Sequence, residues 1–204
     1  MAEPKTEKGR QTKEKILAAA AGLFHERGVS ATSVEQVLAA ARAGKSQFYR
    51  YFPSKEILVS EVIRYQSDRY LGWQRDLLER LDDWEGLEAY FNALVASHSG
   101  REMIGGCPIG SLAAELADRN EAHRRELAEV FSLWEASIEQ VLTKMRAANE
   151  LRPDADPSAL AATTLAGIQG AYLLSTLQKD VRPMRDALEA ILAYLRSFHG
   201  SADR

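Results

Sequence analysis

The stretch KSQFYRYFPSK, residues 45–55, decides how the front of this chain folds. Phe48 and Phe52 are four residues apart, so they lie on one face of a helix. Polar residues occupy the remaining positions, and a proline follows directly. The stretch therefore predicts a short helix with one buried face, which we expect to pack against Leu17, Phe24 and Leu38.

Two further helices are expected before this stretch. The first covers residues 9–27, carries an apolar stripe and ends at Gly28, a residue suited to a C-cap. Thr32 is expected to accept a hydrogen bond from the next turn while Glu35 reaches back, which is a capping box that starts a helix over residues 33–41. Three short helices with a tight turn between the second and third predict a helix-turn-helix, with the third as recognition helix.

The polar face of the third helix suits the major groove of double-stranded DNA. Lys45 and Arg50 can pair with phosphate or with guanine, and Gln47 can offer a donor and an acceptor to an adenine edge. Tyr49 and Tyr51 can donate to phosphates. The alternative, an ordinary surface helix, leaves unexplained why two tyrosines and two cations stand together. With polar groups at the neighbouring helix starts, the expected DNA-contacting set is Thr32, Ser33, Arg42, Lys45, Ser46, Gln47, Tyr49, Arg50, Tyr51 and Lys55.

Charge divides the chain into a basic front and an acidic remainder. The 204 residues carry a net charge of −3, but residues 1–55 hold ten Lys/Arg and five Asp/Glu, a net of +5, and the rest has a net of −8. This pattern favours a DNA-contacting domain carried by a second domain that does not touch DNA. The expected organisation is a flexible arm over 1–9, a helix-turn-helix domain over 10–55, a helical domain over 56–200 and a tail over 201–204.

Composition excludes several classes of protein. Hydrophobic residues make up 46% and charged residues 27% of the chain, an ordinary globular mixture. The single cysteine, Cys107, rules out a disulfide framework, and the four histidines lack metal-ligand spacing, so we expect no metal and no cofactor. No signal peptide and no stretch of membrane-spanning length is expected. A cytoplasmic protein is the prediction.

The rest of the chain predicts helices only. Apolar residues recur at helical spacing, and no run alternates as a half-buried strand does. Prolines stand between the expected helices, and Pro108 suits the first turn of the sixth. The fold class is therefore all-α, an N-terminal three-helix domain plus a C-terminal helical bundle. Four of the further helices are expected over about 55–81, 108–118, 157–177 and 183–199. The fifth and seventh are expected around the apolar faces that run from Leu87 to His98 and from Leu127 to Met145.

The last two expected helices carry apolar stripes too broad for one partner face. Their small residues allow a neighbouring backbone to approach closely, so two helices from each of two chains would form a four-helix interface. A pseudo-palindromic DNA site needs two recognition helices, one from each chain, about one helical turn of DNA apart. The alternative is packing within one chain. The expected homodimer interface comprises Ala166, Gly167, Gly170, Ala171, Leu188, Ile191, Leu195 and Phe198.

Residues 12–58 resemble the DNA-binding domain of the tetracycline-repressor (TetR) family, above all in the stretch 45–55. Residues 106–116 and 169–174 resemble the sixth- and eighth-helix segments of one branch of that family. The resemblance implies a ligand-responsive transcriptional repressor that forms an Ω-shaped homodimer. Arg42 stands where the family usually has glycine, so a left-handed turn here would cost about 1 kcal/mol, unless the turn is shaped differently.

The resemblance also implies an effector pocket among the fourth to eighth helices. Aromatic residues dominate the candidates there, so a hydrophobic or aromatic effector is expected rather than a phosphorylated one. Each candidate has simple core packing as its alternative. The expected effector-binding residues are Trp73, Tyr90, Phe91, His98, Cys107, Phe131, Trp134, Gln169 and Tyr172.

Three functions are alternatives to a repressor released by a non-covalent effector. Cys107 precedes Pro108 at a helix start, where its thiolate would be favoured, so a redox- or electrophile-switched repressor is one alternative; the other reading of this thiol is a small buried hydrophobe. A DNA-binding scaffold without an effector is the second. An enzyme is the third, and it is disfavoured because the sequence has no phosphate loop, metal cluster or paired nucleophile and base.

Overall fold

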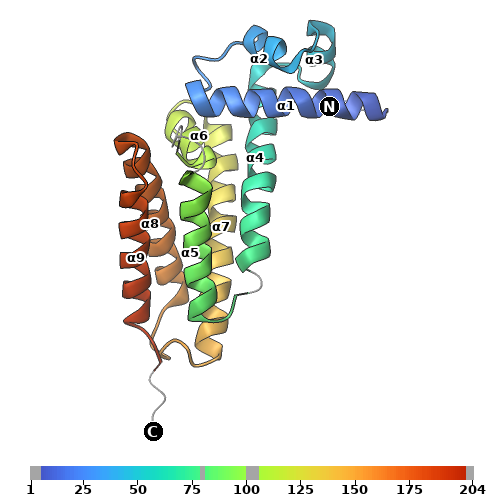
Figure 1. Cartoon of the computed structure of the whole chain (residues 1–204). Coiled ribbons are helices and arrows are strands. Elements are labelled where there is room, and N and C mark those ends of the chain that lie inside the picture. Colours follow the sequence, from blue (N-terminus) through green and yellow to red (C-terminus); the bar gives the residue numbers. More distant parts are fainter. Residues whose placement is uncertain (1–5, 79–80, 100–105, 201–204) are drawn as a thin grey trace. The chain divides into compact units, whose positions relative to one another are not determined.

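The computed structural model describes residues 6–78, 81–99 and 106–200 (Figure 1). Within those residues the chain forms nine α-helices and one isolated β-bridge. The helices are α1 (Glu7–Arg27), α2 (Val34–Ala41), α3 (Lys45–Tyr51), α4 (Lys55–Leu78), α5 (Trp84–Ser99), α6 (Pro108–Leu116), α7 (Glu121–Ala147), α8 (Pro157–Gln178) and α9 (Arg182–Arg196).

The helices divide between two compact units. The first unit comprises the chain up to Arg69 together with Pro108–Ala128, and the second comprises Tyr70–Cys107 together with Glu129–Arg204. Helices α4 and α7 contribute to both units. The first unit is larger than the helix-turn-helix segment expected from the sequence, because α6 and the start of α7 belong to it.

Side-chain caps set the starts of α1 and α2. Thr6 caps α1, so the helix begins inside the segment that was expected to be a flexible arm. Ser33 caps α2 by accepting from the Gln36 N–H at 3.2 Å, and Gln36 Oε1 accepts from the Ser33 N–H at 2.7 Å. The predicted capping box of Thr32 and Glu35 is therefore wrong by one residue.

Aromatic side chains form much of the core of the first unit. Phe48 and Phe52 are fully buried, and their ring centroids lie 5.5 Å apart. Ile16 and Phe24 of α1 are buried as well. Leu17, which the sequence placed in this core, is only half-buried, so its neighbour Ile16 occupies the core position in α1.

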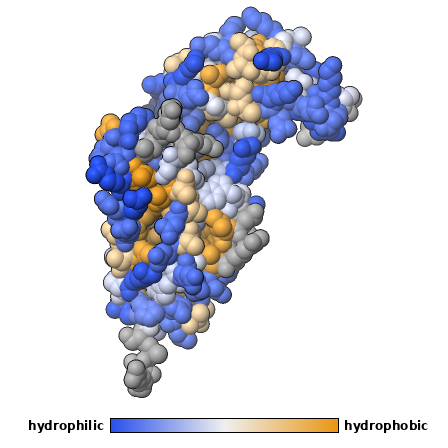
Figure 2. Space-filling view, viewed as in Figure 1, coloured by the Kyte–Doolittle hydropathy of each residue, from blue (hydrophilic) through white to orange (hydrophobic). Residues whose placement is uncertain are grey.

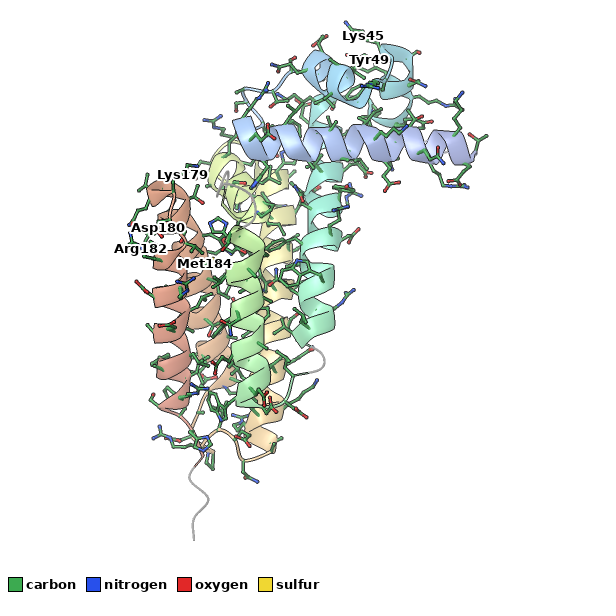
Figure 3. The ribbon with its side chains drawn as sticks, viewed as in Figure 1. Lys45, Tyr49, Lys179, Asp180, Arg182 and Met184 are labelled. Carbon is green, nitrogen blue, oxygen red and sulfur yellow. The ribbon has the colours of Figure 1, made fainter. Side chains whose placement is uncertain are left out.

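Helices α8 and α9 pack along each other in the second unit (Figure 1). Gly167 makes this close approach possible, because a Cβ atom at that position would lie 2.4 Å from Ile191 Cδ1. Ala171, Leu188 and Leu195 are buried in the same chain. The turn between the two helices contains Lys179 and Asp180 (Figure 3), and Asp180 Oδ1 accepts from the backbone N–H of Arg182, the first residue of α9, at 2.9 Å.

Helix α8 is long and apolar enough to cross a membrane by length and composition, the one such helix among the described residues. The sequence expectation that no stretch reaches this length is therefore wrong. About 44% of the apolar window is buried inside the chain. The rest of the helix leaves an apolar face exposed, which includes Leu173 and Leu177.

The chain end is tied back to the bundle of the second unit. Leu151 and His199 form the antiparallel bridge. The Arg152 N–H donates to the Phe198 carbonyl at 2.8 Å, and the Arg152 guanidinium lies 5.2 Å from the Phe198 ring centroid. Trp84 Nε1 donates to His199 Nδ1 at 3.0 Å. Phe198 therefore stabilises the junction of α9 with the α7–α8 connection.

Candidate functional site

The outer face of α3 presents Ser46, Tyr49 and Arg50 to solvent. Tyr49 is 55% exposed, and its ring stands edge-on against Phe48 with centroids 5.2 Å apart. Tyr49 and Lys45 lie on the side of this unit that faces away from α1 (Figure 3). A hydroxyl, a phenol and a guanidinium on one exposed face can donate to phosphate oxygens and base edges.

Two predicted DNA-contacting side chains are engaged by neighbours. Lys45 Nζ lies 3.1 Å from Glu35 Oε1. Two interactions lower the pKa of the Glu35 carboxyl: the larger is a hydrogen bond with the Glu35 backbone, and the smaller is the contact with Lys45. Gln47 Oε1 accepts from the Gly44 N–H at 2.9 Å and so caps the start of α3. One lone pair of the Gln47 amide oxygen is therefore used inside the chain, while its two N–H donors and the second lone pair of that oxygen remain available.

Arg42 ends α2 in the left-handed conformation, with φ 52° and ψ 45°. Left-handed backbone costs a non-glycine residue about 1 kcal/mol or more. Of the two shapes that the sequence left open for this turn, the structure has the left-handed one. The Arg42 side chain is exposed at the junction between α2 and α3, where it remains a candidate phosphate contact.

Three members of the predicted set turn inward. Thr32 is 1% exposed, and its hydroxyl donates to the Gly28 carbonyl at 2.8 Å. Tyr51 is 5% exposed and packs edge-on against Phe52. Lys55 Nζ donates to the Val29 carbonyl at 2.6 Å. These groups hold the unit together in the described conformation, because their polar atoms or rings are already engaged inside it.

A buried network of aromatic hydroxyls lies in the second unit. The Tyr90 hydroxyl donates to Gln74 Oε1 at 2.7 Å and accepts from Trp134 Nε1 at 3.1 Å. The hydroxyls of Tyr70 and Tyr172 are hydrogen-bonded to each other. Burial raises the pKa of Tyr70 and of Tyr90 far above the ordinary value, so both stay neutral.

The predicted effector-binding residues gather around this network. His98 stacks edge-on against Tyr172 with centroids 5.0 Å apart, and Phe131 stacks on Trp134 at 6.2 Å. The sequence missed Tyr70 and Gln74, although both stand on the inner face of α4, one turn apart. Of the predicted set, Tyr90, Phe91, His98, Cys107, Trp134 and Tyr172 are buried, and Trp73, Phe131 and Gln169 are half-buried.

Polar atoms without hydrogen-bond partners accompany these aromatic residues on α8. They are Gln169 Nε2, Ser175 Oγ and Thr176 Oγ1, each buried. An unsatisfied buried polar group costs about 1–3 kcal/mol. Cys107 is itself buried, which favours its interpretation as core packing. Among the described residues, no group of three or more His, Cys, Asp or Glu side chains is placed to hold a metal ion.

A surface groove of about 250 Å³ lies elsewhere in the second unit, between the end of α4 and the middle of α7. None of the predicted effector-binding residues borders it. The groove is therefore a separate feature from the aromatic cluster around Tyr90. Its walls are Arg75, Leu78, Leu133, Ala136, Ser137, Gln140, Val141 and Lys144.

The predicted dimer residues divide into three groups. Ala166 and Gly170 are exposed on α8, whereas Ala171, Leu188 and Leu195 are buried within the chain. Gly167 and Ile191, which pack on each other, are half-buried, and so is Phe198. Figure 2 shows hydrophobic surface in the region of α8 and α9. The large exposed apolar residues there, which the sequence prediction did not name, are Leu173 (67% exposed), Leu174 (47%), Leu177 (75%) and Tyr194 (45%).

A helix-turn-helix with an exposed recognition helix, carried by a chain with a second helical unit, defines a DNA-binding regulator. Residues 16–62 match the family described as bacterial regulatory proteins, tetR family. Residues 84–191 match the family described as tetracyclin repressor-like, C-terminal domain. The chain belongs to the TetR family of transcriptional regulators.

Relatives of known name cover nearly the whole chain. The transcriptional repressor DhaR of Mycobacterium sp. (strain GP1) is 28% identical over 178 residues, which are 85% of this chain and 86% of that protein. The transcriptional regulator LmrA of Bacillus subtilis (strain 168) is 30% identical over 175 residues, which are 85% and 90%. The crystal structure of a TetR transcriptional regulator from Chloroflexus aurantiacus has a TM-score of 0.86 and 27% identity, covering 97% of this chain and 100% of that one.

Proposed function

We propose that this chain represses transcription as a homodimer that binds a pseudo-palindromic operator and leaves it when a small hydrophobic or aromatic effector binds. The observation that carries the proposal is the outer face of α3, where Ser46, Tyr49 and Arg50 are exposed while Phe48 is fully buried. The same helix thus anchors itself by one face and offers hydrogen-bond donors with the other. Binding DNA in the cytoplasm, rather than catalysis, is the activity proposed.

The homodimer is supported by the exposed apolar face of α8. Leu173, Leu174 and Leu177 are all at least 47% exposed, and Ala166 and Gly170 extend the same face. A contiguous apolar surface on a soluble domain marks an interaction site. Because two copies of one chain pair through the same surface on each, this face would place two recognition helices on two half-sites.

The effector class is supported by the buried cluster of the second unit. Its walls are aromatic, and Gln169 Nε2 and Ser175 Oγ are buried there without hydrogen-bond partners. An apolar ligand with one or two polar groups would satisfy these atoms. Effector and operator then oppose each other, since a ligand that weakens DNA binding must itself bind more weakly to the DNA-bound protein.

The test is selection of DNA from a pool of random-sequence duplexes, followed by titration with salt and with a panel of aromatic compounds. We expect an enriched palindrome, strong salt dependence and release by at least one compound. Tyr49→Ala should weaken binding on every sequence, whereas Lys144→Ala in the second unit should not. If no duplex is enriched, the proposed function is wrong and only the family and the fold remain.

A further inference from the structure

A single carboxylate holds the turn between α1 and α2. Glu115 Oε2 accepts from the Val29 N–H at 2.7 Å, and Glu115 Oε1 accepts from the Ser30 N–H at 2.7 Å. Glu115 stands on α6, which lies 85 residues further along the chain but in the same compact unit. Hydrogen bonds to an ionised acceptor are about twice as strong as neutral ones, so these two bonds, which we call the clamp, hold the turn more firmly than neutral hydrogen bonds would.

The turn is also held from its other side. The Val29 carbonyl accepts from Lys55 Nζ at 2.6 Å, so charged groups from α6 and α4 grip the N–H and the C=O of one residue. Arg119 Nη1 donates to Ser30 Oγ at 2.5 Å. Because Glu115, Lys55 and Arg119 all bond to this turn, we expect it to hold a single conformation.

Gly28 is fitted to this clamp. Its φ is +84°, a left-handed value that glycine adopts without strain. A Cβ atom there would lie 2.9 Å from Glu115 Oε2, too close for a real contact. The absence of a side chain at Gly28 therefore leaves room for the Glu115 carboxylate at this turn.

The electrostatics keep Glu115 ionised. Partial burial acts to raise its pKa, but the hydrogen bonds from Ser30 and Val29 and the charge of Arg119 outweigh that effect and lower the pKa. The carboxylate can therefore accept two N–H groups at neutral pH. A neutral amide of the same shape has one oxygen, and its NH₂ would face the second N–H, donor against donor.

The turn that Glu115 holds comes directly before the two helices of the helix-turn-helix, α2 and the recognition helix α3. The turn leads directly to Ser33, the cap of α2, and α2 leads through Arg42 to α3. We propose that Glu115 is a positioning residue for DNA binding, whose carboxylate fixes the α1–α2 turn and thereby holds α2 and α3 in the arrangement that contacts DNA. This proposal rests on the proposed DNA-binding function and adds to it a residue that lies outside the helix-turn-helix.

The test compares Glu115→Gln with Asp118→Asn. Both variants remove one negative charge from the same region, but Asp118 is exposed and lies outside the clamp. The backbone N–H signals of Val29 and Ser30 are followed by NMR without DNA, and affinity is measured well below the melting temperature on the duplex that the wild type selects. We expect Glu115→Gln to shift both signals upfield, to raise their hydrogen-exchange rates at least tenfold and to weaken DNA binding about tenfold. Asp118→Asn should do none of these.

Each other outcome overturns something definite. If the Val29 and Ser30 signals change in Glu115→Gln while DNA affinity stays within twofold, Glu115 is structural only. If the wild type selects no duplex, the proposed function fails and the role of Glu115 fails with it. The two failures are distinguishable, because a purely structural Glu115 leaves DNA binding by the wild type intact. Should Glu115→Gln not fold, Glu115→Asp keeps the charge but reaches one N–H at most. Its expected loss of affinity is about threefold, and unchanged affinity would again contradict the proposal.

Discussion

At the scale of single residues, Gln47 shows how a local hydrogen bond restricts what a side chain can read. Its Oε1 already accepts from the Gly44 N–H, so its two N–H donors are the groups with no bond inside α3. Acceptor-only edges, such as the O6 and N7 of guanine, suit such a group. We expect Gln47→Ala to relax base preference at one or two positions of each half-site, read by repeating the selection. An equal loss of affinity on every sequence would mean that Gln47 contacts the DNA backbone.

Arg42 gives a second prediction at this scale. Its left-handed conformation is strained, so Arg42→Gly should raise the free energy of unfolding by up to about 1 kcal/mol, less the greater entropy of glycine in the unfolded chain. If the guanidinium contacts phosphate, the same variant should bind DNA more weakly, with a salt slope smaller by about one. Denaturant unfolding and a salt titration measure the two effects.

Lys179 is the matched control for Arg42. It ends α8 with φ 52° and ψ 38°, nearly the same backbone as Arg42, but it belongs to the second unit (Figure 3). Lys179→Gly should therefore leave the salt slope of DNA binding unchanged. An unchanged slope in Arg42→Gly as well would mean that Arg42 contacts no phosphate.

At the scale of elements, the sequence predicted where helices lie but not what each cap and end does. The residues of α2 were predicted to within one position and α3 lies in the stretch predicted to form a short helix, because the 3.6-residue period of buried side chains is a local property. Thr32 and Ser33 are adjacent hydroxyls that can each cap a helix, and only the burial of Thr32 in the folded unit decides between them. Lys55 likewise bonds to Val29, a partner 26 residues away that no local pattern reveals.

The tyrosines of the buried network make the stability of the second unit sensitive to alkali. Burial raises the pKa of Tyr70 and Tyr90, so the folded state keeps them neutral where the unfolded chain would ionise them. Their contribution is fully present below pH about 10, the ordinary tyrosine value, and is lost as the pH rises above it. We expect the melting temperature to fall above that pH. Tyr70→Phe should weaken this dependence, whereas Tyr194→Phe, which changes an exposed ring, should not.

At the scale of the whole molecule, the family and the all-α fold were predictable because residues 45–55 are so specific. The packing of α6 was not. Helix α6 belongs to the unit with the helix-turn-helix, and this depends on contacts such as that of Glu115 with Val29. Tyr70 and Gln74 were also missed, because side chains with polar ends are typical of the surface. Only the fold shows that Tyr70 bonds to Tyr172 and Gln74 to Tyr90.

The same limit applies to pairing between chains. The sequence indicated broad apolar stripes on the last two helices but assigned Ala171, Leu188 and Leu195 to the interface, and these are buried in their own chain. Helical periodicity shows which residues share a face, but it cannot show whether that face meets α9 of the same chain or a second copy. The exposed face, which includes Leu173 and Leu177, is the surface left for the proposed second copy.

That face yields the last prediction. Replacing Leu173 and Leu177 together by glutamate removes two large apolar side chains from each copy, and each fully buried leucine is worth about 1.5–3 kcal/mol. Like charges would also meet across a two-fold interface. We expect the double variant to be monomeric by light scattering, to keep its helical circular dichroism and to lose preference for a palindrome over a single half-site. Leu133→Glu is the control, because Leu133 is 63% exposed on α7, away from this face. A double variant that remains a dimer while Leu133→Glu becomes monomeric would place the pairing surface on α7 instead.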